Sequence, residues 1–271
     1  MLAQAIRRTW TQDGAVLFWG RCDLPATRHQ QLRKICRLNP SAIVNASGYT
    51  NLRQAEASPH LTHELHVETP AFLARVCRDQ GIPFASVSSD YVFSGHGRNA
   101  WNEMDIPEPI NAYGRSKLEG ERAVMAANPK AKIIRTAGLF GPAPAGSKVS
   151  FPERVLRQVQ AGHAPKVRSD LTTSICYVDD LALDLRRILE SSSIGIFHVA
   201  HSGGGTWLQI AEYALESAGL PSRIKPIQSP DFPRPRCSIL ATLRLKGMHG
   251  RAIRKSWQEA LGEFMRGFRD V

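Results

Sequence analysis

The chain has 271 residues, of which 42% are hydrophobic, and it carries a formal net charge of +11. This length and composition suit one large globular domain or two closely packed ones, and they exclude a chain too polar to bury a core. No apolar run approaches the ~20 residues of a membrane span, and the apolar stretch in MLAQAIRRTW is too short for a secretory signal, so we expect a cytoplasmic protein with no membrane partner.

The cysteines, histidines and basic residues indicate neither a metal site nor a nucleic acid partner. The five cysteines are odd in number, widely spread and never in a CxxC pair, so we expect reduced thiols. His60, His63 and His66 recur every three residues, but no HExxH pattern accompanies them, and we expect no metal. Arginines and lysines are scattered and aromatic residues are few, so the positive charge predicts attraction of anionic small molecules.

Helical and strand patterns alternate in the first half of the chain. Helices are predicted over 1–12, 28–37, 61–79 and 113–127, and strands over 15–19, 42–44, 82–89 and 131–135. The strands are mostly continuous apolar runs, as in a parallel sheet that helices cover on both faces. We therefore predict an α/β fold with a Rossmann-like, doubly wound parallel sheet.

The pattern loosens beyond Gly141, where PAPAGSKVSFP (142–152) predicts a loop. Helices are predicted over 178–190, 207–218 and 256–268, with Thr206 as the cap of the second, and a strand over 196–200. We expect a core over 1–141 and a smaller region over 142–271, with the 178–200 segment returning to the core.

Two stretches carry the candidate chemistry, Ser88-Ser89-Asp90-Tyr91 and Tyr113-Gly-Arg-Ser-Lys117. Tyr113 and Lys117 are four residues apart and share one face of a helix, so we expect the lysine ammonium to lower the pKa of the phenol toward neutrality. Ser88 and Ser89 end a strand, and we expect them at the surface, on the edge where open α/β sheets bind ligands. A hydroxyl there can orient a carbonyl oxygen while Tyr113 protonates it and a cofactor delivers hydride. A YxxxK pair alone is more often a solvated helix face, and the strand with its serines favours the catalytic interpretation.

The segments SSDYVFSG, PINAYGRSKLEGE and IIRTAGLFG resemble the extended short-chain dehydrogenase/reductase superfamily, and most of all its dTDP-4-dehydrorhamnose reductase branch. The similarity continues through NASGYT (45–50), YVDDLA (177–182), GIFHVAHSGGGTW (195–207) and RPRCSILATLRL (234–245). It implies an NADP-dependent oxidoreductase of dTDP-rhamnose biosynthesis, in which the 142–271 region covers a nucleotide-sugar substrate. It also implies Ser89 as the catalytic hydroxyl, Tyr113 as the acid, and Lys117 as the residue that holds the nicotinamide ribose and tunes the tyrosine.

The cofactor site is only partly recognisable. MLAQAIRRTW resembles the residues that directly follow the fingerprint glycines of the family, so we expect the first strand and its GxxGxxG turn to be missing, unless the coding sequence continues upstream. Gly20-Arg21 suits a 2′-phosphate and favours NADPH, with NADH left open, although an ordinary surface arginine explains Arg21 equally well. The resemblance implies that Asp23 and Leu24 flank the adenine and that Ala46, Ser47 and Gly48 let the cofactor approach the strand end.

Several positions depart from the family and leave the substrate open: Arg53, Gln54, His66 in place of a relay asparagine, and Gly138 in place of a tryptophan. We expect Ser89, Asp90 and Tyr91 to contact substrate, and Arg234 and Arg236 to clamp a diphosphate unless they belong to a merely basic loop.

The favoured function is reduction of a 4-keto-6-deoxysugar nucleotide. One alternative is a catalytically impaired regulatory subunit that binds NADP or a sugar nucleotide and resembles the beta subunit of methionine adenosyltransferase. A further alternative, a nucleic-acid-associated protein, is supported only by the positive net charge. The resemblance also leaves a homodimer open.

Overall fold

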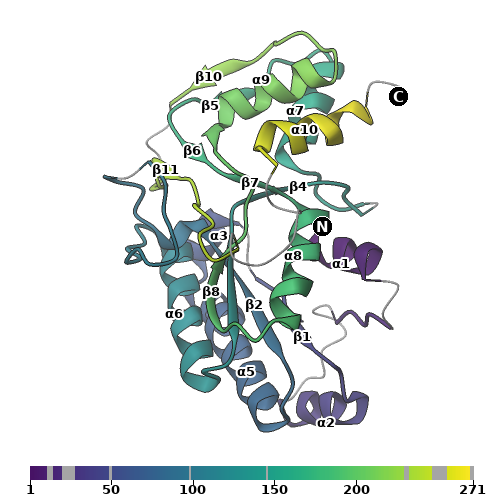
Figure 1. The fold of residues 1–271 in the computed structure, drawn as a ribbon. Coiled ribbons are helices and arrows are strands. Elements are labelled where there is room, and N and C mark those ends of the chain that lie inside the picture. Colours follow the sequence, from purple (N-terminus) through teal and green to yellow (C-terminus); the bar gives the residue numbers. More distant parts are fainter. Residues whose placement is uncertain are drawn as a thin grey trace.

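A computed structural model describes residues 1–10, 15–19, 28–48, 51–97, 99–144, 146–228, 232–245 and 255–268. Its centre is a parallel four-stranded sheet in the order β1-β2-β3-β8. The strands are β1 (Ile43–Asn45), β2 (Phe84–Ser89), β3 (Lys132–Thr136) and β8 (Gly195–His198). Their carboxyl ends face the upper part of the molecule in Figure 1, where the chain leaves the sheet to build the C-terminal region.

Helices cover both faces of this sheet (Figure 1). They are α1 (Leu2–Thr9) and α8 (Val178–Glu190) on one face, and α2 (Arg28–Leu38), α5 (Thr69–Asp79) and α6 (Ala112–Ala127) on the other. Neighbouring residues of β3 divide between the faces, because Ile133 packs with the α2–α5 cluster and Ile134 with the α1–α8 cluster. This confirms the predicted doubly wound α/β fold. None of the described helices combines the length and the apolar character of a membrane span.

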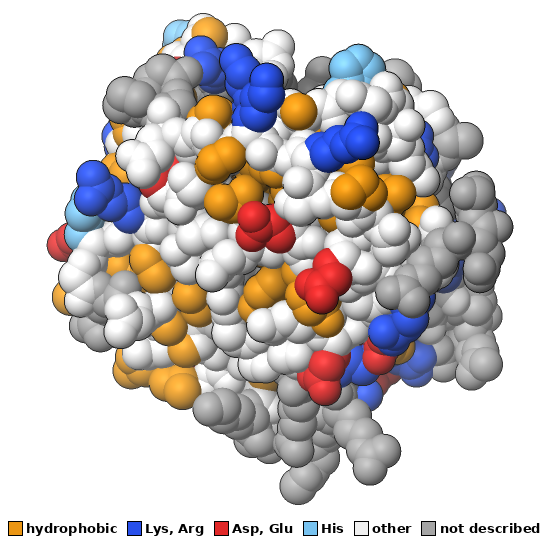
Figure 2. Space-filling model, turned by 90° about the horizontal axis from the view of Figure 1, so that it is seen from above, with side chains coloured by type: hydrophobic (Ala, Val, Ile, Leu, Met, Phe, Trp, Pro, Cys, Tyr) orange, Lys and Arg blue, Asp and Glu red, His pale blue; other side chains and the backbone are white. Residues whose placement is uncertain are grey.

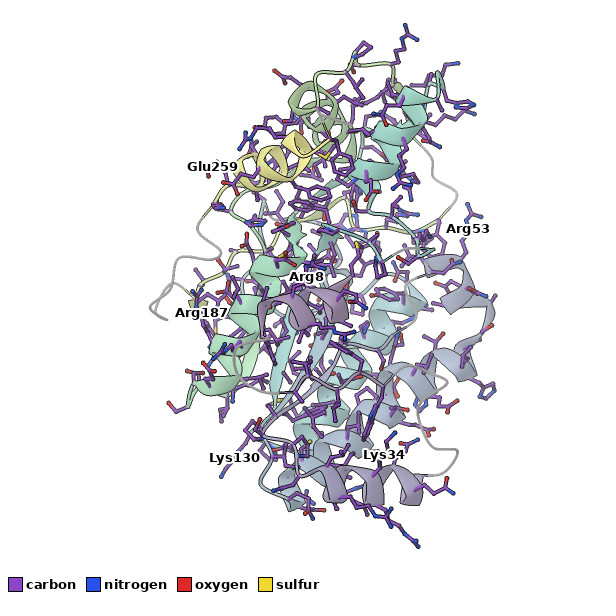
Figure 3. All side chains as sticks on the ribbon, turned by 90° about the vertical axis from the view of Figure 1, so that its right-hand side faces the viewer. Arg8, Lys34, Arg53, Lys130, Arg187 and Glu259 are labelled. Carbon is purple, nitrogen blue, oxygen red and sulfur yellow. The ribbon has the colours of Figure 1, made fainter. Side chains whose placement is uncertain are left out.

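Helix α1 is fixed to α8 by polar bonds as well as by apolar packing. Arg8 on α1 donates a hydrogen bond from Nη2 to Asp179 Oδ1 at 2.5 Å, and Trp10 Nε1 donates to the Ala182 carbonyl at 3.0 Å. Figure 3 shows Arg8 on the side of the molecule where α1 lies across α8. The first predicted helix therefore forms and becomes part of the sheet's cover.

The predicted strand over 15–19 does not form. Val16 packs against the α1–α8 cluster and Trp19 against the α2–α5 cluster, where Lys34 Nζ lies 4.4 Å from the Trp19 ring centroid. In the described part of the sheet, β1 pairs with β2 and has no strand on its other side. The run is therefore only partly buried: Val16 and Trp19 pack inward, Leu17 is 61% exposed, and no described neighbour offers the run a hydrogen-bonding edge.

The predicted helix over 61–79 is observed as a continuous helical segment that contains a π-helical turn. It consists of α4 (Pro59–His63), the π-helical η1 (Glu64–Glu68) and α5. Pro70 has no N–H to donate back to the carbonyl of His66 four residues earlier, so the regular ladder cannot continue there. Helix α6 approaches that same carbonyl, since a Cβ on Gly120 would lie 2.0 Å from His66 O. The irregular turn thus lets α6 pack closely beside η1.

The C-terminal region is smaller and is built on helices. Its core joins α7 (Phe151–Gln160), α9 (Trp207–Ser217) and α10 (Trp257–Arg266) through residues such as Leu156, Ile210 and Leu261. Short strands accompany them: β4 (Gly138–Phe140) with β7 (Ile175–Tyr177), β5 (Lys166–Arg168) with β10 (Lys225–Ile227), and β6 (Thr172–Thr173) between β9 (Gly205–Thr206) and β11 (Cys237–Ser238). Thr206 caps α9 in a reciprocal capping box with Gln209, as predicted for the threonine.

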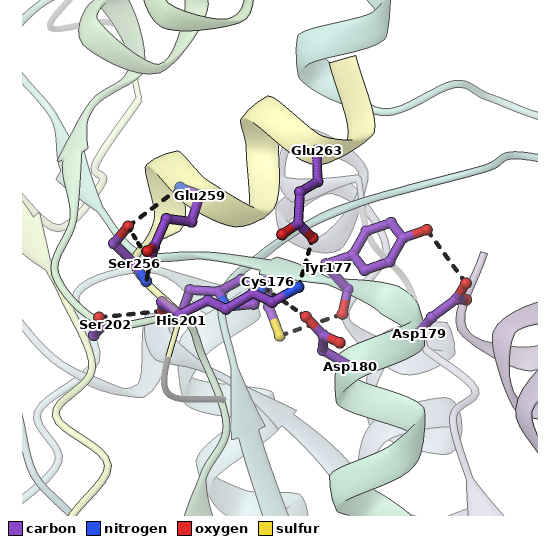
Figure 4. A network of polar contacts seen from close by, with 10 residues as sticks. Cys176, Tyr177, Asp179, Asp180, His201, Ser202, Ser256, Glu259 and Glu263 are labelled. Atoms are coloured by element: carbon purple, nitrogen blue, oxygen red, sulfur yellow. Dashed lines mark hydrogen bonds and ion pairs between the residues drawn. The ribbon is translucent and has the colours of Figure 1, made fainter. Parts of the chain in front are cut away.

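The surface of this region carries its charges in separate groups. Figure 2, seen from above, shows lysine and arginine side chains interrupted by uncharged and hydrophobic ones over this face. Below that face, two polar pairs lie where α8 approaches α10: His201 Nε2 is 3.4 Å from Asp180 Oδ2 on α8, and Lys255 Nζ donates to Glu263 Oε2 on α10 at 2.5 Å (Figure 4). The positive charge of Lys255 also acts on Asp180. The two regions are therefore connected by ionisable groups.

Candidate active site

Ser89 and Tyr113 meet at the carboxyl end of the sheet. Ser89 is the last residue of β2 and Tyr113 is the second residue of α6. A hydrogen bond joins their side chains. Ser89 is only 7% exposed, so the expectation that the strand delivers it to the surface is wrong; it lies in the floor of the site. The structure therefore brings together the two hydroxyls predicted to act on one carbonyl oxygen.

The first turn of α6 is held against the turn that follows β2. Asn111 caps the helix by accepting a hydrogen bond from the Gly114 amide at 2.8 Å, and its Nδ2 donates to Pro233 O at 3.0 Å. A Cβ on Gly114 would lie 2.1 Å from Tyr91 O, so only glycine permits this approach. These contacts set the position of Tyr113 relative to Ser89.

Lys117 lies one turn after Tyr113 but is bonded to the strand. Its Nζ donates to the Val87 carbonyl at 3.2 Å, and a Cβ on Gly48 would lie 3.1 Å from that nitrogen. Burial lowers the pKa of Lys117 to about 8, while the nearby carboxylate of Glu121 opposes the shift. The ammonium is thus placed between β2 and the exposed end of β1.

The expected lowering of the Tyr113 pKa is wrong for this structure. Burial raises the pKa of Tyr113 well above its ordinary value, the negative charge of Asp90 adds to the rise, and the bond with Ser89 opposes it. The Lys117 ammonium makes its hydrogen bond to the Val87 carbonyl, and desolvation of the phenol therefore dominates. A phenol held protonated at neutral pH is suited to donate a proton.

Asp90 lies beneath the two hydroxyls. It is 3% exposed, and its Oδ1 accepts a hydrogen bond from Ser89 Oγ at 2.9 Å, while Thr173 and Ser238 bond the same carboxyl. Burial raises the pKa of Asp90 to about 6. Because the Ser89 hydroxyl donates its hydrogen bond to Asp90, the Ser89 oxygen can accept hydrogen bonds from other groups. The Asp90 carboxyl therefore makes its hydrogen bonds to protein side chains, and the prediction that it contacts substrate directly is not supported by this geometry.

Of the three other residues predicted to contact substrate, two lie at the site and one lies apart from it: Tyr91, Arg234 and Arg236. The Tyr91 ring packs edge-on against Tyr113 at 5.7 Å between centroids, and its hydroxyl is hydrogen-bonded to Arg234. Burial raises the pKa of Tyr91 to about 12. Arg236 is exposed and lies near Asp170, whose pKa is lowered chiefly by Arg168. Arg234 thus reaches the site, and Arg236 lies beside a different acidic group.

His66 is a neighbour of the site that the sequence analysis did not include among the catalytic or binding residues. It is 3% exposed, its Nδ1 lies 2.8 Å from Ser116 Oγ, and its ring meets Tyr113 edge-on at 5.5 Å. Together with Lys117, it lines a small cavity between β2 and α6. Both His66 and Tyr91 therefore pack edge-on with the Tyr113 ring.

A buried ion pair under this cavity was not predicted. Arg135 donates from Nε and Nη2 to the two oxygens of Glu121 at 2.9 and 2.7 Å, and Ser88 Oγ donates to Glu121 Oε1 at 2.5 Å. An arginine inside the apolar run IIRT was the available signal, because a charge in a buried strand needs a partner.

The described cofactor residues fit a nicotinamide ribose. Ala46, Ser47 and Gly48 are exposed at the carboxyl end of β1, and the glycine leaves open the space that a side chain would fill beside Lys117. The remaining predicted cofactor residues, Gly20, Arg21, Asp23 and Leu24, lie outside the described residues, and their roles stay predictions. Within the described ranges no group of three His, Cys, Asp or Glu side chains is placed to hold a metal ion.

Comparison with known proteins gives a consistent result. Residues 1–269 match the family model described as the RmlD substrate binding domain. The chain is 32% identical over 227 residues to a dTDP-4-keto-6-deoxy-D-glucose reductase of Streptomyces niveus, covering 81% of this chain and 77% of that protein. It is 34% identical over 229 residues to a dTDP-4-dehydrorhamnose reductase of Mycobacterium tuberculosis, covering 81% and 74%. A crystal structure of dTDP-4-dehydrorhamnose reductase from Bacillus anthracis in complex with NADP superposes with a TM-score of 0.88 at 25% identity, covering 97% of this chain and 93% of that one.

Proposed function

Because the chain belongs to the RmlD substrate binding domain family, we propose that it is an NADPH-dependent reductase of a 4-keto-6-deoxysugar nucleotide, with Tyr113 as the proton donor. The observation that carries the proposal is the hydrogen bond between Ser89 and Tyr113 at the carboxyl end of the sheet, one helical turn from Lys117. Relatives named as reductases of dTDP-linked 4-keto sugars support the substrate class. The NADP complex of a structural neighbour supports the cofactor.

The cofactor's nicotinamide end would be held by Ala46, Ser47, Gly48 and Lys117. NADPH, when bound, supplies the hydride that goes to the carbonyl carbon. Below its pKa of about 8, Lys117 carries a proton and can donate hydrogen bonds to ribose hydroxyls. Gly48 gives this group close access to the lysine, since a Cβ there would meet Nζ at 3.1 Å.

The chain's own residues act on the carbonyl oxygen. Tyr113 begins protonated, because burial raises its pKa, and it transfers its proton to the oxygen as negative charge develops there. The Ser89 hydroxyl donates to Asp90, so its oxygen accepts from the Tyr113 hydroxyl and holds the phenol in place before its proton moves. The substrate gains one hydride and one proton and becomes an alcohol, and solvent then restores the proton of Tyr113.

A regulatory subunit that only binds its ligand would not need this arrangement. The set of Ser89, Tyr113 and Lys117 is present, and Asp90 and His66 support it from buried positions. We therefore favour the enzyme over the binding subunit.

Turnover tests the proposal directly. The purified chain is mixed with NADPH and a dTDP-linked 4-keto-6-deoxysugar, and the loss of NADPH absorbance is followed together with formation of the 4-hydroxy product. Reduction with a one-to-one yield supports the proposal. If NADPH binds but no 4-keto sugar nucleotide is reduced, the catalytic assignment is wrong and the binding-subunit alternative is favoured.

A further inference from the structure

Trp207 is an aromatic side chain near the proposed site that has no role in the reaction described above. Its indole lies against Gly138, since a Cβ on that glycine would be 2.8 Å from Cη2 of the ring. Gly138 begins β4 and follows closely after Thr136, the residue of β3 that pairs with Ser89 of β2. The indole therefore lies at the carboxyl edge of the sheet, where Ser89 and Tyr113 meet.

Strand pairing brings Trp207 to this edge from the C-terminal region. Thr173 of β6 pairs with Gly205 of β9, and the Thr173 hydroxyl lies 3.4 Å from Asp90 Oδ2. The Trp207 amide donates to the Leu171 carbonyl at 3.2 Å, which extends the contact between the same two segments. The Asp90 carboxyl is therefore joined through β6 and β9 to the start of α9, and this connection fixes the indole relative to the proposed catalytic hydroxyls.

The indole is packed on one side and keeps part of its surface open. Phe151, the first residue of α7, meets the ring edge-on with 4.7 Å between centroids. Trp207 as a whole is half-buried. A side chain at position 138 would displace the tip of the ring, so the glycine permits this placement. The departure that the sequence shows at Gly138 thus gives Trp207 room beside the site.

The indole places an apolar surface beside polar groups. Ser89 and Tyr113 present hydroxyls, and Arg234 bonds the hydroxyl of Tyr91 next to them. In a 4-keto-6-deoxysugar, the C6 methyl group is attached to the ring carbon next to the carbonyl, so it lies close to whatever holds the carbonyl oxygen. An aromatic ring buries a methyl group favourably, whereas a hydroxyl in the same place loses its hydrogen bonds to water.

We propose that Trp207 is a specificity-determining residue, whose indole packs against the C6 methyl group and makes the site prefer 6-deoxysugars to sugars that carry a 6-hydroxyl. The inference rests on the proposed function, because it takes the carbonyl of the same sugar to lie at Ser89 and Tyr113. Apolar pockets discriminate against an added hydroxyl by about 10- to 100-fold, which sets the size of the expected preference. Gly138 is the second part of this arrangement, because it admits the ring.

Binding of dTDP-6-deoxyglucose and of dTDP-glucose isolates the contact, because these two ligands differ only in the 6-hydroxyl. Titration calorimetry with the whole chain and no cofactor measures both affinities without turnover. The unmodified chain should bind the deoxysugar nucleotide at least about tenfold more tightly, and Trp207→Ala should bring the two affinities to within about twofold. Gly138→Ala should reduce the preference in the same direction, because the added Cβ displaces the indole.

Trp257→Phe is the matched control. Trp257 belongs to the same region but packs against Tyr213, so this variant should keep the preference of the unmodified chain. Thermal unfolding shows whether each variant is folded. If Trp207→Ala does not fold, Gly138→Ala decides the question.

The outcomes separate this inference from the proposed function. A preference that survives in Trp207→Ala, or an unmodified chain that binds the two ligands equally or binds neither, would overturn the inference. If the preference depends on Trp207 and no 4-keto sugar nucleotide is reduced, the role of Trp207 stands and the proposed reaction fails. If a 4-keto-6-deoxysugar nucleotide is reduced and the preference does not depend on Trp207, the reaction stands and the inference is wrong.

Discussion

Glu121 and Arg135 form a buried, two-point ion pair beneath the catalytic face, with side chains only 4% and 2% exposed. The pair links α6, which carries Tyr113 and Lys117, to β3 in the middle of the sheet. Its carboxylate also favours the charged form of Lys117. A single pair therefore contributes both to the attachment of the catalytic helix and to the charge of its lysine.

Glu121→Gln should destabilise the protein strongly. The substitution leaves the Arg135 guanidinium buried without a counter-charge, and breaking a buried pair in this way costs about 3–5 kcal/mol of unfolding free energy. Urea denaturation measures the loss. Glu190→Gln is the control, because its pair with Arg186 is exposed, and it should change stability by less than about 1 kcal/mol. Equal effects of the two substitutions would contradict the role given to the buried pair.

Tyr113→Phe should remove nearly all reductase activity while NADPH affinity stays within a few-fold. The phenol is assigned to proton transfer, and it is not assigned to cofactor binding. Steady-state turnover and a separate NADPH titration measure the two quantities. Tyr213→Phe is a matched control, since Tyr213 packs against Trp257 in the C-terminal region. Near-normal turnover of the Tyr113 variant would end the proposed mechanism.

NADPH affinity should fall as the pH rises through about 8. The folded-state pKa of Lys117 is lowered from 10.5 to about 8 by burial, so above that pH the lysine loses the charge assigned to the ribose contact. NADPH titrations at a series of pH values test this. Lys117→Met should bind more weakly and show no such fall. An unmodified protein whose affinity is constant across this range would exclude the charged lysine from cofactor binding.

The lowered pKa of Lys117 also makes the stability of the protein depend on pH. Between about pH 8 and 10.5, the unfolded chain keeps the Lys117 proton that the folded chain has lost. The unfolded state then binds more protons, so the contribution of this group makes folding more favourable as the pH rises through that window. Lys117→Met should abolish this part of the pH dependence of the unfolding free energy.

The sequence was informative where the signal is local. The spacing of Tyr113 and Lys117, and the serines at the end of an apolar run, predicted which elements meet at the carboxyl edge of the sheet. Periodicity predicted the helix over 178–190 with the bounds that α8 has. These features depend on residues that are close together in the chain, so pattern and propensity are sufficient.

Features that depend on distant segments were not predictable in the same way. Whether 15–19 becomes a strand depends on a neighbour to pair with, and the apolar run alone does not supply one. The Tyr113 pKa depends on how deeply the phenol is buried against Ser89 and Tyr91, so the local lysine misled the prediction.

Asp180 and His201 face each other at the junction of α8 and the C-terminal region (Figure 4). Burial shifts the pKa of each group in the direction that favours its neutral form. The pKa of Asp180 is raised from 3.8 to about 6, and that of His201 is lowered from 6.5 to about 4. Lys255 opposes the rise for Asp180. Near neutral pH, the fold therefore holds an ionised carboxylate at a site that disfavours it.

Asp180→Asn should stabilise the protein at neutral pH. Between pH 3.8 and about 6 the folded state keeps a proton on Asp180 that the unfolded state has released, so this group makes folding less favourable as the pH rises through that window. The asparagine variant lacks this unfavourable contribution. Its free energy of unfolding should exceed that of the unmodified protein by about 1–3 kcal/mol above pH ~6, and by little below pH ~4. The lowered pKa of His201 has the opposite effect, because it makes folding less favourable as the pH falls below 6.5. The unmodified protein and the Asp180 variant both contain His201, so this effect is common to them. Thermal unfolding of both proteins across this range isolates Asp180 as the difference. A variant that is less stable at neutral pH would mean that attraction to Lys255 outweighs burial.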